Sequence, residues 1–159
     1  MDELLTDEHK LIRQSVRDWV ESFVMPKIDE AAQNHTDIPN LMKELGKIGA
    51  LGPYIPEEYG GSGLDQISYG IIMQELERGD SAVRSAASVQ SSLVMFPINE
   101  YGSEEQKHKY LPHLASGEMI GAFGLTEPNH GSDPSSMETH FEDKGDHYLL
   151  NGAKMWITN

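Results

Sequence analysis

The 159-residue chain contains no cysteine. That absence excludes a disulfide framework and any chemistry that depends on a thiolate. Long apolar runs are missing too, since no stretch approaches the roughly 20 apolar residues that a membrane span needs. The N-terminus, MDELLTDEHK, is acidic and lacks an apolar run, which argues against a secretory signal and a transit peptide. We therefore expect no membrane span and a location in the cytoplasm or, after processing, an organelle matrix.

Positive charge is scarce. The chain has 12 Lys and Arg residues against 26 Asp and Glu residues, a net charge of −14. Such an acidic surface repels a phosphate backbone, so nucleic acid is not expected as a partner. Solubility is the simplest explanation of the charge, although a basic partner protein or a salty cytoplasm would also suit it. The seven histidines lack the spacing of metal ligands, so no metal site is expected.

The first hundred or so residues are expected to be helical, because apolar side chains recur there at steps of three and four. The first helix should begin at the N-cap Thr6 and end at Pro26, which has no N–H and restricts the residue before it. Further helices are predicted at about 28–33, 40–48, 66–79, 81–101 and 103–110, with an irregular loop over 52–63. Asp65 suits an N-cap, Ser103 and Gln106 suit a capping box, and Gly79 suits a left-handed C-terminal position.

The pattern changes after Gly117. Met119–Thr126 is predicted to be a strand, and two or three further strands follow from Met137. Residues 143–146 are predicted to form a turn, and Asn151-Gly152 is a hairpin signal before a last strand at 153–158.

The expected fold class is therefore multi-domain, α and then β. An all-α helical domain over residues 1–118 should precede the first strands of a β-barrel-like middle domain over residues 119–159. Three or four strands in roughly 40 residues leave unpaired edges and half a core, so we expect the sequence to stop before the sheet is complete. A small sheet that packs entirely onto the helices is the alternative.

The segment GLTEPNHGSDPSS, Gly124–Ser136, has features that suit a phosphate. Thr126 offers a hydroxyl at the predicted strand end, and the backbone N–H groups at Gly131 and Ser132 could form an anion nest. On spacing alone, an ordinary β-turn capped by polar side chains is an equally good interpretation.

GLTEPNHGSD and the downstream WITN resemble the two flavin-contacting segments of the acyl-CoA dehydrogenases, and the helical front with its YGGSG loop resembles that family too. The resemblance covers the whole chain. It implies FAD bound in the middle β-domain, with an isoalloxazine ring between two groups of residues and the pyrophosphate at the glycine turn. By motif position the implied cofactor-binding residues are Phe123, Leu125, Thr126, Gly131, Ser132, Trp156 and Thr158.

The stretch ELERGDSAVRSAASVQSSLVM, Glu75–Met95, closely resembles the glutaryl-CoA dehydrogenases within this family. The resemblance implies that Arg84 binds the distal carboxylate of the substrate, assisted by Glu77 and Ser88, while Ser132 contacts the acyl thioester. The guanidinium fork matches a carboxylate, and the spacing of four residues places Arg84 and Ser88 on one helix face. From spacing alone, a surface ion pair between Arg84 and Glu77 or Asp80 is the simpler interpretation.

The implied activity is FAD-dependent oxidation and decarboxylation of glutaryl-CoA to crotonyl-CoA. Electron-transferring flavoprotein would accept the electrons, and the full-length parent would be a homotetramer. The family's catalytic glutamate lies on a C-terminal helical domain that this sequence does not reach, so we expect no catalytic residue here and an inactive 159-residue chain. One alternative is a dehydrogenase for short or branched acyl chains without a distal carboxylate. Another is an inactive, acidic helical module that binds proteins.

One position departs from the family pattern. The residue before Gly131 is usually small in this family, and here it is His130. A surface histidine without a role is the simpler interpretation. The alternative is a side chain near the pyrophosphate that contributes positive charge below its pKa.

Overall fold

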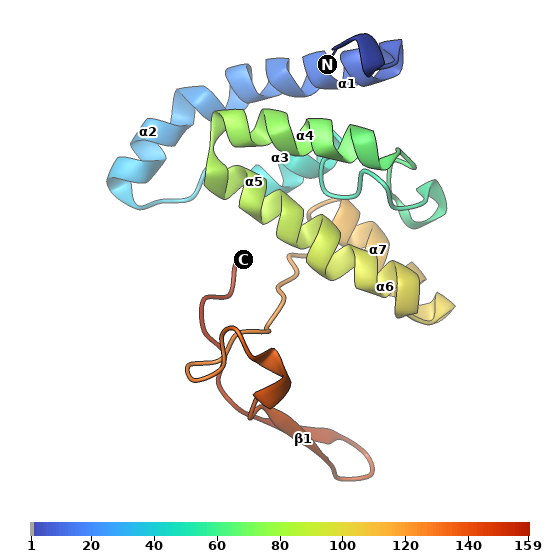
Figure 1. Cartoon of the computed structure of the whole chain (residues 1–159), viewed down its shortest axis with the longest axis vertical. Coiled ribbons are helices and arrows are strands. Elements are labelled where there is room, and N and C mark those ends of the chain that lie inside the picture. The colour runs from blue at the N-terminus through green and yellow to red at the C-terminus, as the bar shows by residue number, and fades with distance from the viewer. Residues whose placement is uncertain (1) are drawn as a thin grey trace.

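The computed structural model describes residues 2–159 and consists of a helical body followed by an extended tail with one small β-hairpin (Figure 1). The α-helices are α1 (Asp7–Trp19), α2 (Met25–Asn34), α3 (Leu41–Lys47), α4 (Gln66–Gly79), α5 (Ser81–Ser88), α6 (Phe96–Tyr101) and α7 (Glu104–Ala115). The π turns are η2 (Val20–Val24) and η4 (Val89–Met95), and the 3-10 turns are η1 (Asp2–Leu4), η3 (Glu57–Tyr59) and η5 (Pro134–Ser136). The strands are β1 (His140–Asp143) and β2 (Tyr148–Asn151). The predicted fold class, helices and then antiparallel strands, is confirmed.

Two apolar clusters fill the helical body. The first is built mainly from α1, α4 and α5, which pack on one another, and it includes the fully buried Val20 and Leu76. The second lies between the 52–63 loop and α7 and includes Ile55 and Leu111. Burial of such side chains contributes about 25 cal/mol for each Å² removed from water, which makes these clusters the main source of stability.

Local capping sets where three of the helices begin. The Thr6 hydroxyl accepts a hydrogen bond from the backbone of His9 at the start of α1. Asp65 caps α4 through the Ser68 N–H, and Ser103 forms a capping box at the start of α7. These caps satisfy N–H groups that have no partner within their helices, and all three were predicted from sequence.

Pro26 does not end the first helix, and that prediction is wrong. The π turn η2 precedes it, and within this turn the Met25 N–H bonds the Val20 carbonyl five residues back. Pro26 then lies in the first turn of α2, where a missing N–H costs little. The π turn η4 repeats this arrangement before Pro97 in α6. Two helical runs, 7–34 and 81–101, therefore continue through a proline.

Gly79 is required by packing. Its backbone is helical, and the chain leaves α4 through an extended Asp80, so the predicted left-handed conformation is wrong. A Cβ on Gly79 would lie 2.5 Å from Cγ1 of Val20. A residue without a side chain is needed because α4 passes close to η2 at this point.

The tail contains a single hairpin. Strands β1 and β2 pair antiparallel, with His140 opposite Asn151, and the predicted turn at 143–146 joins them. The strands predicted at 119–126 and 153–158 are wrong, because neither segment has ladder pairing and 151–152 is no hairpin turn. Every residue of β1 and β2 is exposed, since two strands alone have nothing to pack against. Within residues 2–159, no helix is both long and apolar enough to cross a bilayer.

Candidate functional site

Helix α5 and the end of α4 bring three of the four predicted acyl-site residues together, and the fourth, Ser132, lies in the tail. The Nε of Arg84 donates to Oε2 of Glu77 at 2.6 Å, and a terminal guanidinium nitrogen lies 3.4 Å from Oγ of Ser88. Ser81 donates to the other oxygen of Glu77 at 2.8 Å. The hydrogen bond from Arg84 lowers the pKa of Glu77, so this carboxylate is ionised at neutral pH. The Arg84 side chain remains 36% exposed, which leaves its outer face accessible to a ligand.

The two predicted flavin segments lie beside each other. The Met155 N–H donates to the Thr126 carbonyl at 2.9 Å, and Nζ of Lys154 donates to the Leu125 carbonyl at 3.0 Å. These bonds align the first segment with the second although neither forms a regular strand. Phe123, Leu125 and Trp156 are exposed, and Trp156 is 85% exposed with a left-handed backbone at φ 61°.

Glu127 organises this part of the tail. Its carboxylate is 4% exposed and accepts the backbone N–H groups of Glu138 at 2.7 Å and Thr139 at 2.9 Å, as well as the Lys154 ammonium at 2.9 Å. Hydrogen bonding by Thr139 and Lys154 lowers the pKa of Glu127 to about 2. The sequence does not mark Glu127 for this role, because its partners lie 11, 12 and 27 residues away and no local pattern connects them.

The glycine turn after Glu127 is open. Gly131 and Ser132 are exposed, and a Cβ placed on Gly131 would have no neighbour within 4 Å. Asp133 then accepts hydrogen bonds from two serine hydroxyls and thereby orders η5. Nε2 of His130 lies 3.6 Å from a carboxylate oxygen of Glu138, and its role at a pyrophosphate stays a prediction.

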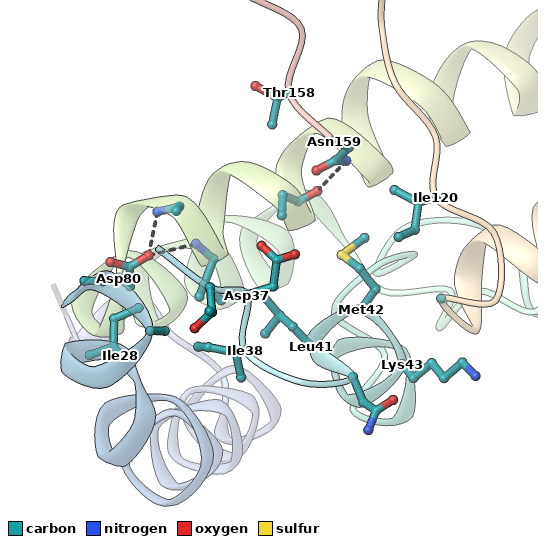
Figure 2. A pocket seen from close by; sticks show the side chains of 18 of the residues that line it. Ile28, Asp37, Ile38, Leu41, Met42, Lys43, Asp80, Ile120, Thr158 and Asn159 are labelled. Atoms are coloured by element: carbon teal, nitrogen blue, oxygen red, sulfur yellow. Dashed lines mark hydrogen bonds between the residues drawn. The ribbon is translucent and has the colours of Figure 1, made fainter. Parts of the chain in front are cut away.

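A cavity of about 1010 Å³ opens on another side of α5, between α2, α3 and the end of the chain (Figure 2). Asp80, Met42, Ile120 and Thr158 are among the side chains around it. Of the predicted site residues, Thr158 is the one that lines this cavity in the described chain, and the Arg84 cluster does not. The structure therefore does not unite all the predicted residues in one cavity.

Comparison with known proteins identifies the family. Residues 6–118 match the pattern described as "Acyl-CoA dehydrogenase, N-terminal domain", and residues 122–159 match "Acyl-CoA dehydrogenase, middle domain". The chain belongs to the acyl-CoA dehydrogenase family. It is 41% identical to a glutaryl-CoA dehydrogenase of Desulfococcus multivorans and 43% identical to a short-chain specific acyl-CoA dehydrogenase of Clostridium acetobutylicum. Both comparisons cover 100% of this chain but 42% of the relative, so the chain spans less than half of their length.

The fold of an acyl-CoA dehydrogenase solved with its cofactor is closely similar. The crystal structure of a glutaryl-CoA dehydrogenase from Mycobacterium smegmatis in complex with FADH2 superimposes with a TM-score of 0.95. It is 45% identical, and the match covers 99% of this chain and 40% of that one. Overall identity does not separate the substrate classes, because the glutaryl and short-chain relatives match this chain about equally.

Proposed function

We propose that this chain forms one side of the FAD site in an acyl-CoA dehydrogenase that acts on glutaryl-CoA. The observation that carries the substrate class is the cluster of Arg84 and Ser88 on α5 with Glu77 near the end of α4. Family membership supports the cofactor, and the FADH2-bound relative with a TM-score of 0.95 supports the way it is held. We place the boundary between the helical and middle domains at 118/119, supported by matches to 6–118 and 122–159.

The residues of the tail fit a flavin. Phe123, Leu125 and Trp156 present apolar surface that nothing in the described chain covers, which suits the faces of an aromatic ring system. Thr126 and Thr158 offer hydroxyls beside that surface. The open backbone at Gly131 and Ser132 admits a diphosphate closely, and its N–H groups can donate to phosphate oxygens.

Arg84 recognises the distal carboxylate in this proposal. Its Nε is held by Glu77, which fixes the plane of the guanidinium and leaves terminal N–H groups for a ligand. Ser88 adds a hydroxyl at one edge of the same surface. A planar fork with a second hydrogen-bonding group selects a carboxylate over an alkyl end, because an acyl chain without the acid leaves the guanidinium unpaired.

The chain contributes binding and orientation. Bound FAD would supply the hydride acceptor for oxidation of the acyl-CoA to an enoyl-CoA, which for glutaryl-CoA is followed by loss of the distal carboxylate as carbon dioxide to give crotonyl-CoA. None of the described residues is assigned as the base that removes the α-proton. Ser132 is proposed to contact the acyl thioester. Electron-transferring flavoprotein as the acceptor, a homotetramer and a cytoplasmic or matrix location are proposed from the resemblance.

The test uses the full natural polypeptide loaded with FAD, under anaerobic conditions, with bleaching of the flavin absorbance as the readout. Glutaryl-CoA should bleach the wild-type protein. Arg84→Ala should lower kcat/KM for glutaryl-CoA by about two to three orders of magnitude, because the distal carboxylate of the bound substrate loses its charged hydrogen-bonding partner. Butyryl-CoA is the internal control and should change by no more than about threefold, since it makes no contact with the guanidinium. Arg84→Lys keeps the charge but loses the fork and should give an intermediate loss.

The same experiment separates the alternatives. If butyryl-CoA bleaches the wild-type flavin as well as glutaryl-CoA does, and Arg84→Ala changes neither, the protein is a dehydrogenase for short acyl chains. The 43% identity to the short-chain relative makes this the second candidate. A full polypeptide that is colourless and takes up no FAD would favour a protein-binding module.

A further inference from the structure

Gln90 lies at the centre of the molecule, in η4, and is fully buried. Its Nε2 donates to the carbonyls of Leu114 and Met119, each at 2.8 Å, and its Oε1 accepts the Gly121 N–H at 2.8 Å. A primary amide offers two N–H donors and one carbonyl acceptor, so every group of this side chain has a partner. The amide thereby ties the 81–101 helical run to the end of α7 and to the 119–121 segment. A buried polar network that is fully satisfied in this way specifies one arrangement of the elements it joins.

Gly121 is held from two sides. Its N–H goes to Gln90, and its carbonyl accepts Nδ2 of Asn159 at 3.1 Å. A Cβ at this position would collide with the side chain of Val94, so the backbone is pressed directly onto η4. Asn159 also donates to the Ala86 carbonyl of α5 at 3.5 Å (Figure 2). The start of the first flavin segment and the end of the second are thus attached to one helical run.

That helical run also carries the acyl-site cluster. Arg84 and Ser88 lie in α5, six and two residues before Gln90, and Gly121 stands two residues before Phe123. We call the proposed apolar surface of Phe123, Leu125 and Trp156 the flavin wall. The amide of Gln90 is the short, buried connection between the helix that carries Arg84 and the segment that leads into this wall.

We propose that Gln90, assisted by Asn159, is a positioning residue that sets the separation between the flavin wall and Arg84 and so selects the length of the acyl chain. The inference rests on the proposed function. A diacid is held at both ends, by Arg84 at its distal carboxylate and by the flavin wall at the carbons that react. A substrate held at one end tolerates a change in that separation, and one held at both ends does not.

The experiment compares variants of the full FAD-loaded polypeptide. Gln90→Leu removes all three hydrogen bonds at similar volume, and Asn159→Ala removes the hydrogen bond to the Gly121 carbonyl from an exposed position. Ser91→Ala is the matched control, because Ser91 is the fully buried neighbour whose hydroxyl bonds only carbonyls of its own helical run. The readout is the ratio of kcat/KM for glutaryl-CoA to kcat/KM for butyryl-CoA, measured on protein with full flavin content.

Gln90→Leu should lower this ratio about tenfold and Asn159→Ala about threefold, mainly through kcat, while Ser91→Ala leaves it unchanged. Equal losses on both substrates in Gln90→Leu and Asn159→Ala would overturn the inference and leave Gln90 as a stabilising residue. A fall in the ratio for Ser91→Ala as large as that for Gln90→Leu would overturn it too. If Gln90→Leu does not accumulate, Asn159→Ala and the conservative Gln90→Asn decide the question.

Failure of the proposed function would be seen in the wild-type protein, because glutaryl-CoA would not bleach its flavin. The inference about Gln90 rests on that function and is then overturned with it. If glutaryl-CoA does bleach the wild-type flavin but the ratio is unchanged in Gln90→Leu and Asn159→Ala, the inference alone is overturned.

Discussion

The helical body and the tail are stabilised in different ways. All 19 buried apolar residues in the described chain lie between Val16 and Ala115, whereas the one buried residue after 118 is the carboxylate of Glu127. Removal of apolar surface from water stabilises the body, and hydrogen bonds and ion pairs such as Lys154–Glu127 hold the tail together. All seven of the proposed flavin contacts lie in the tail. The functional segments therefore take their geometry from polar contacts and their support from the helices beneath.

The largest expected effect is on the free energy of unfolding, in a matched pair of leucine-to-alanine variants. Leu76→Ala, in the core of the body, should lower the free energy of unfolding by about 2–5 kcal/mol, because it leaves a cavity at a fully buried site. Leu150→Ala, at a tail residue that is 70% exposed, should change it by less than about 0.5 kcal/mol. Urea unfolding followed by circular dichroism measures both. A large loss for Leu150→Ala would mean that the tail has a core of its own.

Added methyl groups sharpen the same comparison. Gly79→Ala should destabilise by about 1–3 kcal/mol, because its Cβ would press on Val20. The added methyl group of Gly131→Ala, in the tail, meets open space and should change the free energy of unfolding by less than about 0.5 kcal/mol. The same variant should lower FAD affinity if a diphosphate lies against this glycine. Gly70→Ala is the control within α4, where a Cβ also meets nothing, and should stabilise by about 0.5–1 kcal/mol. Thermal unfolding of the three variants would contradict this account if Gly79→Ala were neutral.

The smallest expected effect is local and depends on pH. The pKa of Glu127 is lowered to about 2 in the folded tail, against about 4.3 for an unfolded glutamate. Its contribution is therefore fully present above the unfolded value and is lost as the pH falls through the folded value. Carbon-13 NMR of the carboxyl should give a midpoint near 2, with Thr139 amide protection lost over the same range. A midpoint near 4.3 would show that the contacts to Thr139 and Lys154 do not persist in solution, and Glu127→Gln should abolish the titration.

Much of the fold could be predicted because its signals are local. The N-caps Thr6, Asp65 and Ser103 each act within three residues, so sequence alone located three helix starts. Pro26 and Gly79 were interpreted wrongly because their roles depend on a neighbouring π turn and on a helix distant in sequence. The strand pattern at 119–126 identified extended chain, but a strand also needs a partner, which periodicity does not reveal.

The candidate site also contains residues that local sequence patterns reveal and residues that they do not. Arg84 and Ser88 lie four residues apart in α5, and Glu77 lies near the end of α4, so helical spacing grouped the first two and the resemblance added the third. Gln90 was overlooked because it stands in a run of small residues, and its partners come from two other segments, 24–31 residues away. Long-range polar contacts have no sequence period, so only the structure reveals them.

The π turn η4 divides the 81–101 helical run into two parts whose side chains are rotated relative to each other about the helix axis. An ideal α-helix turns by about 100° for each residue, so the number of residues between two side chains fixes the angle between them around the helix axis. A π turn contains one extra residue and therefore changes the angle between side chains before it and side chains after it. The face that carries Arg84 is thereby decoupled from the face that packs beyond Pro97. Removing one residue from η4 would rotate one face against the other without breaking the helix, which makes this turn a natural place for length variation to alter acyl recognition.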